Sequence, residues 1–282
     1  MLKDDENKKE FLGSSYAECD IAVFGIPYDG TTSYRPGTRF GPAAIRAEMY
    51  GLETYSPYLD KDLDDCKVCD LGDIEIPFGN REQVLQKIAD ETKSMLADGK
   101  KTLALGGEHL VSYPVIKEYA KKYSDLVVLH FDAHTDLREE FFGEKLSHAT
   151  VIKRVYDILG NDRIYQFGIR SGTKKEFDFG RDHTNLHKFH AIDVAAVADK
   201  IIDKPVYLTI DLDVLDPSIF PGTGTPEAGG LTFNELMHAI ESMDGLNIVG
   251  ADIVELSPHY DASGVSTAVA CKVLREILLI MA

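Results

Sequence analysis

Short apolar runs alternate along the chain with longer stretches in which apolar residues recur at helical spacing. The apolar runs predict strands and the periodic stretches predict helices. The predicted strands cover residues 21–24, 102–105, 126–131, 164–167, 206–210 and 247–254, and the predicted helices cover residues 42–48, 81–97, 111–122, 149–159, 232–243 and 266–281. This alternation predicts an α/β protein with three layers, α/β/α, around a central, mostly parallel sheet.

Length and composition favour one large domain. The chain has 282 residues and contains no Pro- or Ser-rich linker, low-complexity tract or internal repeat. We therefore predict a single domain over residues 1–282, in which residues 1–16 form an N-terminal extension. The first residues lack the apolar segment of a signal peptide, and no apolar stretch is long enough to span a bilayer. We expect a cytoplasmic protein without a membrane partner.

The net charge indicates which partners to expect, and the cysteine content indicates which redox compartment. The formal net charge of −17 argues against a nucleic-acid partner and favours attraction of a cationic small molecule. The 4 cysteines are few for so long a chain, which suits a reducing compartment and argues against a disulfide framework. Cys66 and Cys69 have C-x-x-C spacing, but no second pair accompanies them, so we interpret them as structural residues.

Side chains of the kind that bind metals follow three of the predicted strands. Asp132, His134 and Asp136 occupy alternate positions after the run 126–131, so their side chains point the same way if the segment is extended. Asp211 and Asp213 repeat this spacing after the run 206–210. His109 follows the strand 102–105 and two glycines. Since ligand sites of open α/β sheets lie at the carboxyl ends of the strands, we predict a metal site there.

The composition of this set favours two metal ions. Four carboxylates without cations would repel one another, whereas two divalent ions balance their charge. Oxygen-rich ligation with two imidazoles and no thiolate favours Mn²⁺ over structural zinc. Any single Asp after a strand also has a structural interpretation as a turn former or helix cap. The combination from three strand ends is what indicates a binuclear metal site.

Three segments resemble the metal-binding signatures of the ureohydrolase (arginase/agmatinase) family. They are Gly106 to His109, Asp132 to Asp136 and Asp211 to Pro217, and they stand in the family's order. The resemblance extends from Gly25 to Pro258. It implies an arginase-like fold and two Mn²⁺ ions per subunit, bound by His109, Asp132, His134, Asp136, Asp211 and Asp213.

Within this family the chain is most similar to the agmatinases. Tyr34 to Pro42 and Gly168 to Arg170 resemble agmatinase motifs, and the loop 137–148 lacks the Asn with which arginases hold the amino-acid head of their substrate. The resemblance implies hydrolysis of agmatine to putrescine and urea, a step of polyamine biosynthesis. A guanidinium carbon is a poor electrophile, so this reaction needs the strong nucleophile that metal-bound water provides.

The resemblance also implies roles for further residues. Glu255 corresponds to the family's guanidinium-binding Glu, whose carboxylate can accept two parallel N–H bonds. His148 corresponds to a loop His that passes a proton to the leaving amine, and an imidazole suits this task. Asp136 would assist that proton transfer. Thr225 corresponds to a substrate-contacting Thr, while Asp216 is expected to order its loop rather than bind metal.

The sequence leaves alternatives open for the substrate and the assembly. Glu139, Glu140 and Glu144 could meet an ammonium tail, whereas Arg138 and Lys145 could meet a carboxylate tail. A guanidino-acid hydrolase acting on guanidinobutyrate is therefore the main rival, with arginase and formiminoglutamase behind it. Outside this class, the rivals are a binuclear phosphoesterase, whose usual motifs are missing, and a catalytically inactive scaffold or binding protein. The family resemblance implies a homo-oligomer, trimer or hexamer, with residues 2–16 or 174–188 as candidate interface segments.

Overall fold

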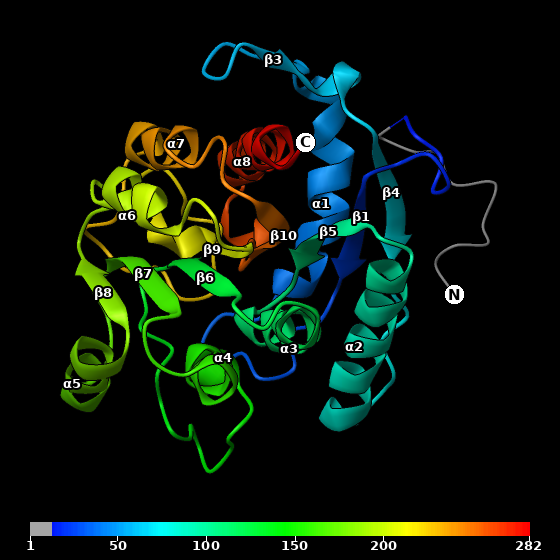
Figure 1. The fold of residues 1–282 in the computed structure, drawn as a ribbon. Coiled ribbons are helices and arrows are strands. Elements are labelled where there is room, and N and C mark those ends of the chain that lie inside the picture. The colour runs from blue at the N-terminus through cyan, green and yellow to red at the C-terminus, as the bar shows by residue number, and fades with distance from the viewer. Residues whose placement is uncertain (1–12) are drawn as a thin grey trace.

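The main feature of the computed structural model, which describes residues 13–282, is an eight-stranded sheet (Figure 1). Its strand order is β4-β1-β5-β10-β9-β6-β7-β8, and every neighbouring pair is parallel. The strands are β1 Ile21–Ile26, β4 Val68–Asp73, β5 Lys101–Gly106, β6 Val127–Phe131, β7 Ile164–Ile169, β8 Asn185–Lys188, β9 Val206–Asp211 and β10 Ile248–Val254. A separate antiparallel pair joins β2 Tyr55–Ser56 to β3 Lys61–Asp62.

Helices cover both faces of this sheet. The helices are α1 Gly41–Glu48, α2 Arg81–Ala97, α3 Ser112–Lys122, α4 Val151–Leu159, α5 Lys174–His183, α6 Val194–Ile201, α7 Phe233–Glu241 and α8 Val265–Met281. In Figure 1, α1, α6, α7 and α8 lie on one side, and α2, α3 and α4 lie on the other. The predicted three-layer α/β/α fold is therefore confirmed, and the sheet is entirely rather than mostly parallel.

The alternation of side chains along each strand builds two hydrophobic cores. In β1, Ile21 and Val23 belong to the core under α1 and α8, whereas Ala22 and Phe24 belong to the core under α2 and α3. All six residues of β1 are buried, because both faces of the sheet are covered. This is why the strands are continuous apolar runs in the sequence.

The edges of the sheet depart from the prediction. The edge strands β4 and β8 and the helices α5 and α6 were not predicted. β8 has the sequence NLHK and is only partly buried, so it lacks the continuous apolar run that marks the central strands. Residues 174–188, which we considered as an interface loop, form α5 and β8. Residues 1–12 of the predicted N-terminal extension lie outside the described residues.

The cysteines form a single crosslink. Cys19, just before β1, is disulfide-bonded to Cys69 in β4, whereas Cys66 and Cys271 are free. The two residues of the C-x-x-C pair therefore do not pair with each other. One disulfide is not a disulfide framework, as the low cysteine count predicts.

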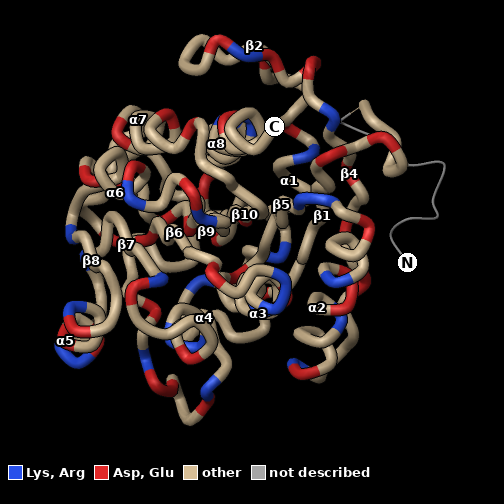
Figure 2. The backbone as a smooth tube through the Cα atoms, viewed as in Figure 1, with Lys and Arg blue, Asp and Glu red and all other residues tan. Residues whose placement is uncertain are grey.

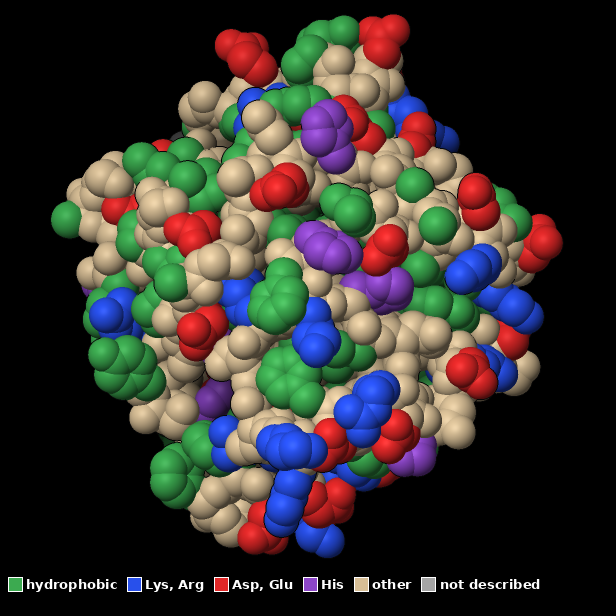
Figure 3. All heavy atoms as spheres, turned by 90° about the vertical axis from the view of Figure 1, so that its left-hand side faces the viewer, with side chains coloured by type: hydrophobic (Ala, Val, Ile, Leu, Met, Phe, Trp, Pro, Cys, Tyr) green, Lys and Arg blue, Asp and Glu red, His purple; other side chains and the backbone are tan. Residues whose placement is uncertain are grey.

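The surface combines charges of both signs. Basic and acidic segments are interspersed along α2 and α5 (Figure 2). On the face drawn in Figure 3, hydrophobic side chains lie singly or in small groups among charged and polar ones. Within residues 13–282, no helix is both long and apolar enough to cross a membrane.

Candidate metal centre

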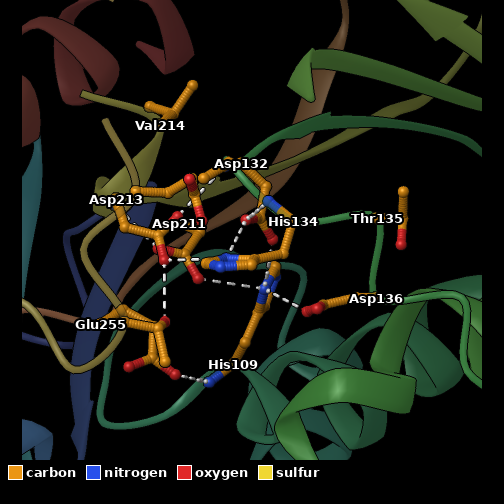
Figure 4. Close-up of polar contacts among 12 residues, drawn as sticks. His109, Asp132, His134, Thr135, Asp136, Asp211, Asp213, Val214 and Glu255 are labelled. Atoms are coloured by element: carbon orange, nitrogen blue, oxygen red, sulfur yellow. Dashed lines mark hydrogen bonds and ion pairs between the residues drawn. The ribbon is translucent and has the colours of Figure 1, made fainter. Parts of the chain in front are cut away.

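All six predicted metal ligands lie at the carboxyl ends of three of the four central strands of the sheet. His109 follows β5, the segment from Asp132 to Asp136 follows β6, and Asp211 ends β9, two residues before Asp213. Glu255 follows β10, which lies between β5 and β9. Because parallel strands end at one edge, four segments far apart in the sequence converge on one point (Figure 4).

His109 is surrounded by carboxylates. Its Nδ1 atom lies 3.2 Å from Asp132 Oδ2, 3.1 Å from Asp136 Oδ2 and 3.4 Å from Asp211 Oδ2. This buried nitrogen has no hydrogen-bond partner of good geometry among the described residues. A nitrogen lone pair facing three carboxylate oxygens is the arrangement expected of ligands that share a cation.

His134 completes the other side of the cluster. Its Nδ1 atom lies 3.3 Å from Asp132 Oδ1 and 3.0 Å from Asp213 Oδ2. Asp132 thus contacts both imidazoles. In Figure 4, Thr135 and Val214 point away from the cluster while their neighbours point into it, as the alternate spacing predicts.

Buried hydrogen bonds fix which nitrogen His109 presents. Its Nε2 atom lies 3.0 Å from Thr209 Oγ1, and this hydroxyl donates to Asp252 Oδ1 at 2.6 Å. Tyr207 donates to the other oxygen of Asp252 at 2.7 Å. Since the Thr209 proton is directed at Asp252, Thr209 accepts from Nε2–H of His109. The lone pair of His109 is therefore on Nδ1, inside the cluster.

A second buried chain orients Asp132. Gln166 Nε2 donates to the carbonyl of Thr135 at 2.9 Å, and since a carbonyl only accepts, this bond fixes the orientation of the amide. Gln166 Nε2 also donates to His130 Nδ1 at 3.1 Å. The proton of His130 is therefore on Nε2, which lies 2.9 Å from Asp132 Oδ2. This chain holds the carboxylate of Asp132 in one orientation.

The electrostatics of the cluster favour a bound cation. Burial, together with the charges of Asp213 and Asp132, raises the pKa of Asp211 well above its usual value. Burial and the charge of Asp132 raise the pKa of Asp136 to about 7. Among the described residues, no Lys or Arg forms an ion pair with any of the four carboxylates. Divalent cations would supply the charge that these carboxylates lack, so the residues fit a metal site.

The pKa values of His109 and Asp132 shift so that each residue favours its charged form. Burial opposes protonation of His109, but contacts with Asp132, Asp136 and Asp211 raise its pKa well above the usual value. Burial alone would raise the pKa of Asp132, but hydrogen bonds with His109, His130 and His134 lower it well below the usual value. Both shifts have the sign expected where the surroundings favour positive charge at the centre of the cluster.

Two of the predicted site residues, Asp136 and Glu255, have a left-handed backbone conformation that residues other than glycine rarely adopt. Asp136 has φ 50° and Glu255 has φ 66°. The Glu255 N–H donates to the carbonyl of Gly107 at 2.9 Å, and Glu255 Oε1 accepts from the His109 N–H at 2.9 Å. Left-handed conformations of this kind cluster at functional sites, where the surroundings hold them.

A cavity of about 260 Å³ opens beside the cluster. Its wall includes Asp136, Glu255, Thr225 and His148, together with His109, His134 and Asp211. Thr225 donates to Asp213 Oδ2 at 3.1 Å. Burial, as the largest cause, lowers the pKa of His148 to about 4, so this imidazole is neutral near pH 7.

The outer part of the cavity differs from the prediction. Of the five loop residues considered for the substrate tail, only Arg138 is among the described residues that line it. Glu139 pairs with Arg154 and Glu144 pairs with Arg81 instead. Glu176, which the sequence did not single out, is part of the wall and accepts from Thr135 Oγ1 at 2.7 Å.

The loop after β9 is fixed by backbone contacts. Asp216 accepts from Ser218 N at 2.9 Å and from Gly229 N at 2.8 Å. Hydrogen bonding by Ser218, through its side chain and then its backbone, lowers the pKa of Asp216 to about 2. The prediction that Asp216 orders its loop is therefore confirmed. Arg170 Nη2 donates to the carbonyl of Asp213 at 2.7 Å and thereby ties this loop to the end of β7.

Sequence reasoning missed the residues that support the cluster from behind. His130 and Asp252 are polar residues inside otherwise apolar strands, and that interruption is the signal that could have found them. Glu108 lies within the segment Gly106 to His109, which resembles a family signature. It was missed because a Glu after a strand is usually exposed, whereas Glu108 is fully buried.

Comparison with known proteins agrees with this geometry. The family model described as "Arginase family" matches residues 19–280. The agmatinase of Bacillus anthracis is 50% identical over 277 residues, with 96% of each chain covered. The guanidinobutyrase of Pseudomonas aeruginosa is 36% identical, with 93% of this chain and 86% of the relative covered. A crystal structure of a candidate agmatinase from Clostridium difficile has a TM-score of 0.93 and 53% identity, with 95% and 98% covered.

These matches cover almost all of the residues that the structure describes. The prediction of an enzyme with an arginase-like fold is confirmed. The chain belongs to the arginase family.

Proposed function

We propose that this protein hydrolyses agmatine to putrescine and urea with two Mn²⁺ ions. The observation that carries the proposal is the convergence of four buried carboxylates and two imidazoles beside a cavity that also contains Glu255 and His148. Similarity to agmatinases at 50% identity supports agmatine as the substrate.

The residues suited to hold the metals are the six of the cluster. His109 and His134 would each bind through Nδ1, and Asp132, Asp136, Asp211 and Asp213 would bind through carboxylate oxygens. When bound, the ions would balance the carboxylate charge and activate water as a nucleophile near neutral pH. Oxygen-rich ligation without thiolate favours Mn²⁺.

Glu255 would orient the guanidinium group. Burial, together with the charges of Glu108 and Asp213, raises the pKa of Glu255 well above its usual value, so a cation in the cavity would stabilise its charged form. One of its oxygens already accepts from the His109 N–H at 2.9 Å, which fixes the carboxylate. A planar cation can donate two N–H bonds to such a carboxylate.

Proton transfer would involve Asp136 and His148. Water adds to the guanidinium carbon, the bond from that carbon to the alkyl nitrogen breaks, and the leaving amine takes up a proton. Since His148 is neutral near pH 7, it can accept a proton released in the first step and donate it to the amine. Asp136 is part of the same cavity wall and would assist this transfer.

Arg138 gives a reason to consider a second substrate, one that carries a carboxylate. Its side chain is part of the cavity wall and lies 3.6 Å from Glu176, so the outer wall presents one cation and one carboxylate. A guanidino acid such as guanidinobutyrate would place its carboxylate toward Arg138. The ammonium of agmatine would instead face Glu176. The similarity to a guanidinobutyrase at 36% identity makes this the second candidate.

The test is release of urea by the Mn²⁺-loaded protein from agmatine, guanidinobutyrate and arginine in parallel. The double variant Asp132→Ala, Asp213→Ala serves as the blank. We expect urea from agmatine, and none from the double variant. Faster turnover of guanidinobutyrate would favour the second candidate, whereas no urea from any of the three would contradict the proposal.

The location, assembly, pathway and domain organisation of the protein are also proposals. We propose a cytoplasmic homo-oligomer, trimer or hexamer, in polyamine biosynthesis, in keeping with the family resemblance. We also propose that residues 1–282 form one domain.

A further inference from the structure

We infer that Thr31 is a positioning residue that places the His148 backbone through a hydroxyl held by buried Glu108. The inference rests on the proposed function, because it gives His148 its role in proton transfer. Thr31 lies in the loop after β1 and is not among the described residues that line the cavity beside the cluster. It would therefore act through His148 rather than on the substrate.

Glu108 binds Thr31 with an unusually complete set of hydrogen bonds. The Thr31 N–H donates to both carboxylate oxygens, at 3.0 and 3.1 Å. The Thr31 hydroxyl donates to Glu108 Oε1 at 2.9 Å. The Glu108 side chain is fully buried, so these bonds are shielded from competition with water. Residues 77 positions apart are thus fixed relative to each other.

The backbone of the loop is fixed at the same place. The Glu108 N–H donates to the carbonyl of Tyr28 at 2.8 Å. A Cβ atom on Gly107 would lie 1.9 Å from that carbonyl oxygen, so only glycine permits the approach. The loop after β1 therefore rests directly on the segment that carries His109.

Thr31 also binds the backbone of His148. The His148 N–H donates to Thr31 Oγ1 at 3.1 Å. The single proton of that hydroxyl is directed at Glu108, so the oxygen faces His148 as an acceptor. Two residues further along the loop, Ser33 Oγ lies 3.2 Å from His148 Nε2. The backbone and the ring of His148 are thus both held by one loop, and Thr31 anchors that loop to Glu108.

Thr32 provides a matched control. Its hydroxyl also contacts Glu108, at 3.4 Å from Oε2, but within the described part of the chain it has no hydrogen bond with His148. Replacing Thr by Val removes a hydroxyl and keeps the shape of the side chain. The pair Thr31→Val and Thr32→Val therefore separates the contact with His148 from a general weakening of the Glu108 site.

The experiment measures kcat and KM for agmatine in these two variants, in Thr31→Ser and in the parent protein. Bound Mn²⁺ and thermal unfolding are recorded for each. We expect Thr31→Val to lower kcat about tenfold or more, since small displacements of a catalytic group are costly. Its KM and metal content should match the parent. Thr31→Ser, which keeps the hydroxyl, and Thr32→Val should stay near the parent.

A double-variant cycle shows whether Thr31 acts through His148. In a His148→Asn background, Thr31→Val should cause no further loss of kcat, because the group it positions is gone. A full additional loss in that background would overturn the inference, as would equal effects of Thr31→Val and Thr32→Val. If Thr31→Val does not fold, Thr31→Ala also lacks the hydroxyl and should give the same pattern.

The outcome for the parent separates this inference from the proposed function. A Mn²⁺-loaded parent that releases no urea from any guanidino compound would overturn both. An active parent with unchanged kcat in Thr31→Val would overturn only the role of Thr31.

Discussion

The carboxylates at β4 and those at the carboxyl ends of β6 and β9 differ in where the compensating charge comes from. At β4, Arg46 Nε lies 2.7 Å from Asp70 Oδ2, and Arg46 Nη1 contacts Asp73. At the carboxyl ends of β6 and β9, four carboxylates lie around two imidazoles, and no described Lys or Arg pairs with them.

The difference separates a structural ion pair from a site that needs a cation. Arg46 belongs to the chain, so the β4 pair is complete once the protein has folded. In the cluster, burial and neighbouring carboxylates raise the pKa of Asp136 and of Asp211, so full ionisation is unfavourable without added charge. We infer that four buried carboxylates gathered at one point, without a Lys or Arg partner among the described residues, indicate an external cation.

The largest expected effect is loss of the cluster. The double variant Asp132→Ala, Asp213→Ala should lose at least about ten-thousandfold in urea release, because water is then no longer activated. Metal content and urea release by purified protein are the measurements. Asp178→Ala, which removes a carboxylate from an exposed ion pair on α5, is the control and should behave as the parent. Similar losses in both would contradict the comparison.

The next effect concerns the structural pair. Arg46→Met leaves Asp70 buried without its partner and should lower the free energy of unfolding by about 3–5 kcal/mol. Chemical denaturation measures this loss. The Mn²⁺ content should be unchanged, because Arg46 has no contact with the cluster. Loss of metal in this variant would show that the two regions are not independent.

His148 differs from both regions, because it lies beside the cluster and is uncharged near pH 7. Burial lowers its pKa to about 4, so it is neutral above that pH and titrates below the working range. His148→Asn should lower kcat about a hundredfold. The acid limb of the pH profile above pH 5 should keep its midpoint, since His148 does not titrate there. A midpoint that moves with this substitution would contradict the neutral assignment.

The smallest expected effect is on the chain behind Asp132. Gln166→Leu removes the donor to His130 and frees the ring that orients Asp132. We expect Mn²⁺ affinity to fall about tenfold, as for other residues behind metal ligands. Isothermal titration of metal-free protein measures it. Affinity equal to that of the parent would mean that the cluster is oriented without this chain.

The central fold and the cluster could be predicted from the sequence because their signals are local. Continuous apolar runs marked six strands, and the alternation of Asp132, His134 and Asp136 placed three side chains on one side. The edge strands β4 and β8 lack such runs, so their place depends on neighbours that the sequence does not reveal.

The contacts of the supporting residues could not be predicted, for a related reason. Glu108 binds Thr31 across 77 positions, and Gln166 reaches His130 across 36. Contacts of that kind depend on strand order and loop path, which the apolar pattern does not determine. Glu176 in the outer cavity wall was also missed, because it is brought there by the position of α5 rather than by any motif.

The most direct test of the external-cation claim is a titration of metal-free protein with Mn²⁺, with bound metal and urea release from agmatine measured in the same samples. We predict two ions per chain and urea release that rises with their binding. No binding of Mn²⁺ to the metal-free protein would contradict the claim, as would full urea release before Mn²⁺ is added.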